Sequence, residues 1–142
     1  MLTDIHPYLT GDLLRHLDAM GHSDAVVLAD ANFPAERLAS RVLTFPGLGT
    51  PELLAAVRTV VPLDDDPALD LMLSPDDDGA PLPVQEELIA AAGAGAGGVR
   101  FFGRDDFYER AAAAHVVVRT GETRIFGNVI LRKGVVSPAG GR

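Results

Sequence analysis

Two polar residues flank a continuous apolar run near the N-terminus. His22 precedes the run Ala25–Ala29, and Asp30 follows it directly. A histidine can give or take a proton near neutral pH, and a carboxylate accepts hydrogen bonds from hydroxyl groups. Such a run is typical of a strand covered on both faces, and open α/β sheets bind ligands at the carboxyl ends of their strands. Asp30 is therefore a candidate binding residue, whereas spacing alone does not place His22 in the same site and leaves it a structural or capping role as the alternative.

The glycine-rich segment over residues 93–98 resembles a dinucleotide-binding loop only superficially. Such a loop must follow a strand and open a helix, so that the helix N-terminus meets the pyrophosphate. Here the order is reversed, because a helix is predicted before the segment and a strand after it. A flexible helix-to-strand connection is the better interpretation.

Metal binding has little support in the sequence. The aspartate triplets at 64–66 and 76–78 lack the spacing of an EF-hand loop and fit solvated turns. No two histidines stand at the spacing of a zinc-binding helix, and the chain has no cysteine. We therefore expect no metal or other cofactor, and surface or structural roles for the remaining histidines: His6, His16 (at the edge of the first helix) and His115.

Composition narrows the class of protein further. The chain has 142 residues, of which 47% are hydrophobic, and this predicts one globular domain over residues 1–142. Its net charge of −8 disfavours contacts with nucleic acids and anionic membranes. The N-terminus lacks the pattern of a signal peptide, and the longest weakly polar stretch, residues 88–99, is too short to span a membrane. A soluble, acidic, cytoplasmic domain is expected.

Helical and strand patterns alternate along the chain, which predicts an α/β fold with three layers, α/β/α. The last two strands have no helix between them, so we expect them to pair antiparallel in a mixed central sheet. The first helix is capped by Thr10 and ends at Gly21. Further helices are expected over 35–40, 50–60, 83–92 and 105–114, and strands over 25–29, 42–45, 69–73, 99–102, 116–119 and 129–132.

Several short motifs follow one another along the chain. Met-Gly-His-Ser-Asp stands at 20–24 and Asp-Ala-Asn-Phe-Pro at 30–34. Phe-Tyr-Glu-Arg follows at 107–110, Thr-Gly-Glu at 120–122 and Phe-Gly-Asn at 126–128. Together with residues 130–135, these blocks resemble the RbsD/FucU family of L-fucose mutarotases and D-ribose pyranases. The resemblance covers most of the chain, with residues 63–98 loosely matched, and it favours the fucose branch.

The resemblance implies a small α/β subunit that assembles into homo-oligomeric rings, typically decamers, with monosaccharide sites at subunit contacts. In the family, the histidine after Met-Gly is the proton donor, which corresponds to His22. The family pattern departs at two positions, because its usual histidine is Asn32 here and its tyrosine is Phe126. The positions that would contact sugar are Asp30, Arg104, Tyr108, Phe126, Gly127 and Asn128.

The resemblance thus predicts an isomerase that interconverts the α and β anomers of L-fucose or a similar aldose. Opening a sugar ring needs a positioned acid and base but no nucleophile, metal or redox group, and histidine suits this task. A D-ribose pyranase, or a sugar-binding or transport-associated protein without catalysis, are the alternatives.

Overall fold

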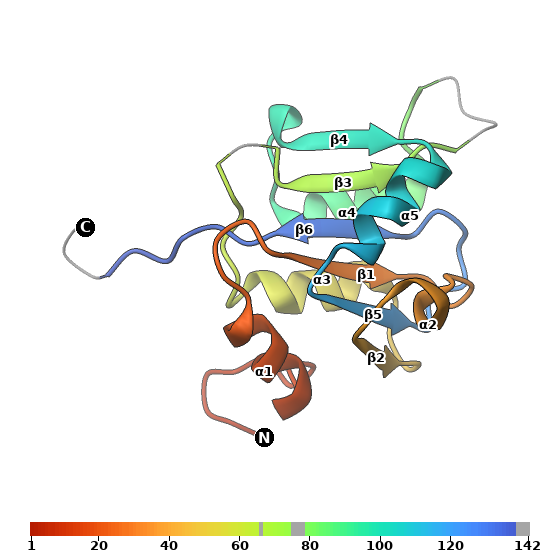
Figure 1. Cartoon of the computed structure of the whole chain (residues 1–142). Helices are drawn as coiled ribbons and strands as arrows, with labels where there is room; N and C mark the ends of the chain where they lie inside the picture. The colour runs from red at the N-terminus through yellow and green to blue at the C-terminus, as the bar shows by residue number, and fades with distance from the viewer. Residues whose placement is uncertain (66, 75–78, 139–142) are drawn as a thin grey trace.

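The strands of the structure form one mixed sheet (Figure 1). In the computed structural model, which describes residues 1–65, 67–74 and 79–138, this sheet has six strands in the order β2-β5-β1-β6-β3-β4. β6 runs antiparallel to both of its neighbours, β1 and β3, whereas the other pairs are parallel. The strands are β1 (Ala25–Ala29), β2 (Val42–Phe45), β3 (Leu69–Met72), β4 (Val99–Phe102), β5 (Val116–Thr120) and β6 (Val129–Arg132).

Helices cover both faces of the sheet. The side chains of Val26 and Leu28 in β1 pack with those of α1, α3 and α4, whereas Val27 and Ala29 pack with Phe107 of α5 and Ala35 of α2. Because alternate residues of a strand point to opposite faces, both faces of β1 are apolar. The predicted three-layer α/β/α fold is confirmed. The helices are α1 (Gly11–Ala19), α2 (Ala35–Leu38), α3 (Thr50–Arg58), α4 (Pro83–Ala92) and α5 (Arg104–Ala112), with a short 3₁₀ turn at Ala96–Gly98.

The expected pairing between the last two strands is wrong. β5 lies beside β1 and ends at the same edge of the sheet, with Arg119 opposite Ala29. The chain then crosses the end of β1 and returns as β6 on its other side, with Val129 opposite Leu28. The crossing segment, residues 121–128, therefore lies next to the residue that follows β1.

Two smaller expectations also need correction. His16 lies buried in α1 rather than at its edge, and its ring meets that of His115 with 5.6 Å between centroids. Burial lowers the pKa of His16. Asp64 is not a free turn residue, because it contacts His22 and Ser23. Asp66 and the triplet at 76–78 lie outside the described residues. In the described part of the chain, no helix is long and apolar enough to cross a membrane.

Candidate functional site

A pocket of about 240 Å³ lies at the carboxyl end of β1. Asp30 enters it directly from the strand, Arg104 and Tyr108 come from the first two turns of α5, and Phe126 and Asn128 come from the segment that crosses β1. Five of the residues predicted to bind sugar thus meet in one place, although they are far apart in the sequence. The remaining lining residues are Asn32, Phe33, Met72 and Ile125.

Asp30 and Asn128 form the buried polar part of the pocket. The amide oxygen Oδ1 of Asn128 accepts a hydrogen bond from the backbone N–H of Asp30 at 2.7 Å, and its Nδ2 donates to Asp30 Oδ2 at 3.1 Å. Asp30 Oδ1 accepts from the backbone N–H of Asn32 at 3.0 Å. Burial nevertheless raises the pKa of the Asp30 carboxyl above its ordinary value, since desolvation penalises the charged form.

Aromatic rings form the other wall of the pocket. Phe33 is buried and meets the ring of Tyr108 edge-to-face, with 5.3 Å between centroids. It also contacts Phe107, whose buried ring fixes α5 against the sheet. The contact with Phe107 therefore anchors this aromatic wall to the hydrophobic core. The wall offers an apolar surface against which the C–H face of a sugar ring can pack.

Phe126 has an unusual backbone conformation. Its φ of 61° is in the left-handed region, which costs a non-glycine residue about 1–3 kcal/mol. The backbone oxygen of Phe126 accepts a weak hydrogen bond from Gln85 Nε2 at 3.5 Å. Gly127 is buried next to this turn, and a Cβ there would lie 3.0 Å from Glu122 Cγ. Gly127 is not a lining residue, so its place in the site is to let the turn pack closely.

His22 lies at the other end of β1 and does not enter this pocket. The strand alone separates the two ends by about 16 Å, at roughly 3.3 Å per residue. The His22 side chain is 61% exposed, and its Nε2 lies 3.0 Å from Asp64 Oδ1. Within one copy of the chain, the predicted proton donor and the predicted sugar-binding residues are therefore apart.

Asp64, His22 and Ser23 form a polar cluster at this other end of β1. The sequence did not indicate that Asp64 belongs to it. Ser23 Oγ donates to Asp64 Oδ2 at 2.7 Å, and this bond is the largest cause that lowers the pKa of the Asp64 carboxyl. A carboxylate that contacts one nitrogen of an imidazole fixes the orientation of the ring. The contact spans 42 positions of the sequence, and no local pattern around Asp64 signals it.

The other three histidines contact neighbouring residues of the fold and lie outside the pocket. His6 accepts a hydrogen bond from the backbone N–H of Tyr8 in the N-terminal loop, at 3.1 Å. The rings of His16 and His115 contact each other, and Arg41 donates to the backbone oxygen of His115 at 3.1 Å. Among the described residues, no group of three or more histidine, aspartate or glutamate side chains is arranged to hold a metal ion.

Comparisons with known proteins agree with this architecture. The chain is 41% identical over 150 residues to the fucose mutarotase of Homo sapiens, covering 96% of this chain and 95% of that protein. It is 37% identical to the L-fucose mutarotase of Histophilus somni, covering 95% and 97%. A crystal structure of the fucose mutarotase of Streptococcus pneumoniae in complex with L-fucose has a TM-score of 0.85 and 36% identity, covering 96% of this chain and all of that one. Residues 3–136 match the model of the RbsD / FucU transport protein family, and the chain belongs to that family.

Proposed function

We propose that the chain is a sugar mutarotase, an isomerase that interconverts the α and β anomers of L-fucose or a similar aldose. The observation that carries this proposal is the pocket at the end of β1, where Asp30, Asn128 and Arg104 offer hydrogen bonds beside aromatic rings. Sugar hydroxyls donate to a carboxylate in charge-assisted bonds, and an arginine can donate to two hydroxyl oxygens at once. Relatives that are 37–41% identical to the chain over nearly its whole length bear the name fucose mutarotase.

The reaction requires two proton transfers. Loss of the anomeric O–H proton and protonation of the ring oxygen break the bond between C1 and the ring oxygen, which leaves an open-chain aldehyde. Rotation about the C1–C2 bond and reclosure on the other carbonyl face give the second anomer. General acid–base catalysis of this kind contributes roughly 10²–10⁴-fold, which suits a reaction that already proceeds in water.

In this proposal His22 is the proton donor. The Asp64 carboxylate holds one ring nitrogen at 3.0 Å, which leaves the other nitrogen free to face a substrate. Asp30 binds a sugar hydroxyl, and burial makes its carboxylate a stronger proton acceptor than a free aspartate. Arg104, Tyr108, Phe126 and Asn128 orient the ring.

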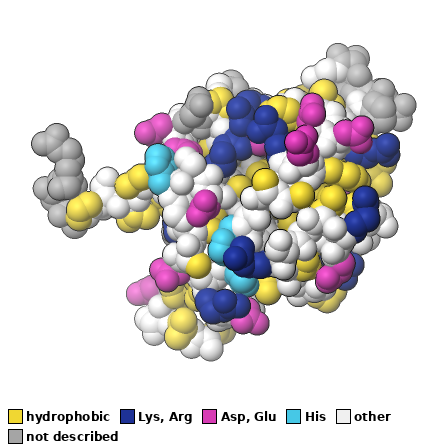
Figure 2. Space-filling model, in the orientation of Figure 1, with side chains coloured by type: hydrophobic (Ala, Val, Ile, Leu, Met, Phe, Trp, Pro, Cys, Tyr) yellow, Lys and Arg dark blue, Asp and Glu magenta, His cyan; other side chains and the backbone are white. Residues whose placement is uncertain are grey.

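Because His22 and Asp30 lie at opposite ends of β1, a shared site needs two copies of the chain. We propose that one copy places its His22 over the Asp30 pocket of the next, in a head-to-tail contact that can close into a ring. Exposed apolar surface supports this contact: Ile125 lines the pocket and is 64% exposed, and Figure 2 shows hydrophobic side chains gathered on the side where β1 and β5 end in Figure 1. A decamer, a cytoplasmic location and a single domain over residues 1–142 stay predictions.

Exchange NMR on purified protein with L-fucose, D-ribose and D-galactose tests the activity. Enhanced exchange between the α and β anomers of fucose supports the proposal. Exchange only between pyranose and furanose forms of ribose would identify a pyranase. Saturation transfer from protein to sugar without either exchange would identify a sugar-binding protein that lacks catalysis.

Mixing two inactive variants tests the shared site. His22→Ala is expected to lose anomeric exchange, and Asp30→Asn to lose most of it at fucose concentrations below its raised Kd, while both variants remain folded. When the two are dissociated and reassembled at equal amounts, about a quarter of the sites combine an intact His22 with an intact Asp30 from different copies, so activity should return. Continued inactivity of the mixture, or a mass by light scattering near the 14.9 kDa of one chain, would contradict the shared site.

A further inference from the structure

Glu122 ties the end of β5 to the backbone at the end of β1, where Asp30 enters the pocket. Its backbone oxygen accepts from the N–H of Ala31 at 2.9 Å, just after Asp30. Its backbone N–H donates to Thr120 Oγ1 at 3.1 Å, and this hydroxyl donates to the backbone oxygen of Ala29 at 2.8 Å, just before Asp30. The backbone on both sides of Asp30 is thus tied to the start of the crossing segment.

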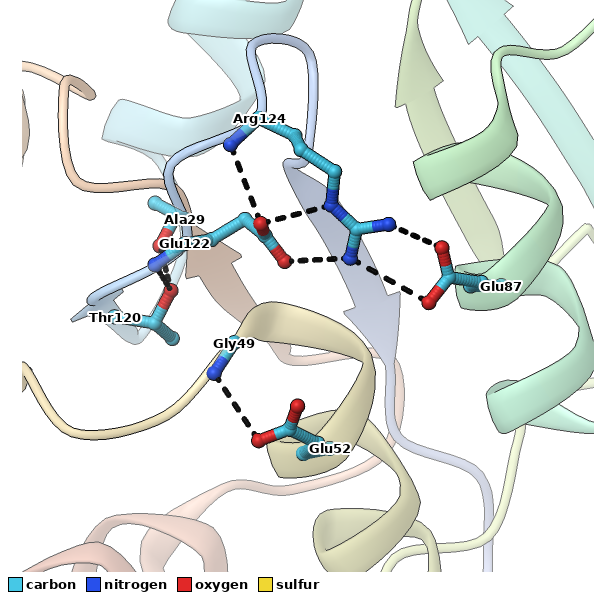
Figure 3. A network of polar contacts seen from close by, with 7 residues as sticks. All are labelled: Ala29, Gly49, Glu52, Glu87, Thr120, Glu122 and Arg124. Atoms are coloured by element: carbon cyan, nitrogen blue, oxygen red, sulfur yellow. Dashed lines mark hydrogen bonds and ion pairs between the residues drawn. The ribbon is translucent and has the colours of Figure 1, made fainter.

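The Glu122 side chain is held by Arg124 (Figure 3). Glu122 Oε2 accepts from Arg124 Nε at 3.0 Å and from the Arg124 backbone N–H at 3.2 Å, while Oε1 accepts from Arg124 Nη2 at 3.0 Å. The same guanidinium also binds the carboxylate of Glu87 on α4. The Glu122 side chain is only 6% exposed, and these bonds keep it ionised in spite of its burial, because the Arg124 side chain is the largest cause that lowers its pKa.

The held carboxylate supports the turn that lines the pocket. Gly127 packs so closely on the Glu122 side chain that a Cβ at position 127 would lie 3.0 Å from Glu122 Cγ. The turn at Phe126 has a left-handed φ, a conformation that persists only where its surroundings impose it. Asn128, the next residue, must then place its amide oxygen 2.7 Å from the Asp30 N–H.

We infer that Glu122 and Arg124 are positioning residues of the sugar pocket: Arg124 ties the Glu122 carboxylate to α4, and Glu122 holds residues 126–128 against Asp30. This inference rests on the proposed function for its effect on sugar binding. Neither side chain lines the pocket, so both act through Asn128 and Phe126. The expected result of losing the ion pair is weaker sugar binding, with little change in the chemistry once sugar is bound.

Arg124→Met, Arg124→Lys and the double variant Glu122→Gln with Arg124→Met test the inference. Arg124→Met should raise the Kd and KM for L-fucose about tenfold, with a much smaller change in kcat. Lysine keeps the charge but lacks the planar fork with which arginine binds both oxygens of each carboxylate, so the Kd of Arg124→Lys should lie between those of wild type and Arg124→Met. If Arg124 acts through Glu122, the double variant should bind fucose as weakly as Arg124→Met alone or Glu122→Gln alone, without an additive loss.

Arg100→Met is the matched control. Arg100 pairs with the buried Asp70 at 3.2 Å, and its side chain is 37% exposed against 43% for Arg124, but it lies on β4, away from the pocket. The Arg100→Met variant should have a lower Tm but the same Kd for L-fucose as wild type. An unchanged Kd in Arg124→Met, or an equal change in Arg100→Met, would overturn the inference.

A crystal structure of Arg124→Met separates the inference from the proposed function. The distance from Asn128 Oδ1 to Asp30 N, 2.7 Å here, should exceed hydrogen-bond length in the variant. If the wild-type protein neither binds fucose nor exchanges its anomers, the proposed function fails, but this distance still decides the positioning role. An unchanged distance would overturn it.

Discussion

The amide of Asn128 binds Asp30 at two points, the backbone N–H and one carboxylate oxygen. A carboxylate has about four lone-pair sites, and the protein fills one on each oxygen of Asp30 through Asn32 and Asn128. The unfilled sites can accept hydroxyl protons from a ligand in the pocket. The same contact joins the end of β1 to the start of β6, so the binding residue and the central strands of the sheet are held together.

Asp30→Asn should weaken sugar binding while leaving the fold intact. An amide loses charge-assisted bonds worth about 1.5–3 kcal/mol, which corresponds to roughly a 10- to 150-fold rise in the Kd for fucose. The chain should still fold but with a lower Tm, because both Asp30 oxygens accept hydrogen bonds and the amide Nδ2 of an asparagine would face one of those donors. Titration calorimetry measures the Kd, and the exposed Asp18→Asn on α1 serves as control. An unchanged Kd with a lower Tm would reduce Asp30 to a structural residue.

Phe126→Tyr should restore the hydroxyl found at this position in the family pattern. The ring already lines the pocket, so the added oxygen needs only a partner from a sugar hydroxyl or water. Such a bond is worth about 0.5–1.5 kcal/mol, and KM for fucose should fall by a few-fold to about tenfold. Anomeric exchange rates and Tm are measured together. A lower Tm without a kinetic gain would show that the hydroxyl is buried away from the sugar.

Gly121→Ala should destabilise the protein strongly. A Cβ at this position would lie 2.0 Å from the backbone oxygen of Pro46, and backbone atoms cannot yield as a flexible side chain does. Overpacking of this kind costs about 3 kcal/mol or more, which should appear as a large fall in the free energy of unfolding. At Gly95 a Cβ has none of the described atoms within 4 Å, so Gly95→Ala is the control. Equal stabilities of the two variants would contradict the close approach.

Glu122 should contribute a stability that acid removes. Arg124 lowers the pKa of the folded-state carboxyl below that of a free glutamate, about 4.3. The contribution is therefore complete above that pH and is lost as pH falls toward the lowered value. Asp30, whose pKa is raised, acts in the opposite direction, so the comparison must be between Glu122→Gln and wild type. The stability difference between the two proteins should shrink as pH falls from 5 toward 3, and a constant difference would contradict the prediction.

Local sequence patterns were sufficient to predict the helices and strands, and to identify Asp30 as a binding residue. The apolar run Ala25–Ala29 predicts β1, and the position of Asp30 after it predicts a binding residue at the sheet edge. Strand β4 and helix α4 have the predicted bounds. Pro83 marks the start of α4, and Gly98 directly precedes β4. Resemblance to a family, rather than spacing, then added the distant residues of the pocket.

The long-range pairings could not be predicted, because they depend on strand order. Asn128 reaches Asp30 across 98 positions only because β6 lies beside β1 rather than beside β5. Asp64 reaches His22 across 42 positions through the connection that precedes β3. Neither contact leaves a periodic trace in the sequence. The wrong pairing of β5 with β6 and the wrong interpretation of Asp64 have this same cause.

The position of β6 also has a consequence for how the chain is made. β6 is the only link in the described sheet between the half formed by β2, β5 and β1 and the half formed by β3 and β4. It is also the last strand of the described chain to be synthesised. On a ribosome, which emits the N-terminal part first, the two halves have no common strand until residues 129–132 emerge. The edges of β1 and β3 that β6 later covers stay open to other chains during that interval, and a nascent chain stalled before Val129 would expose both to aggregation.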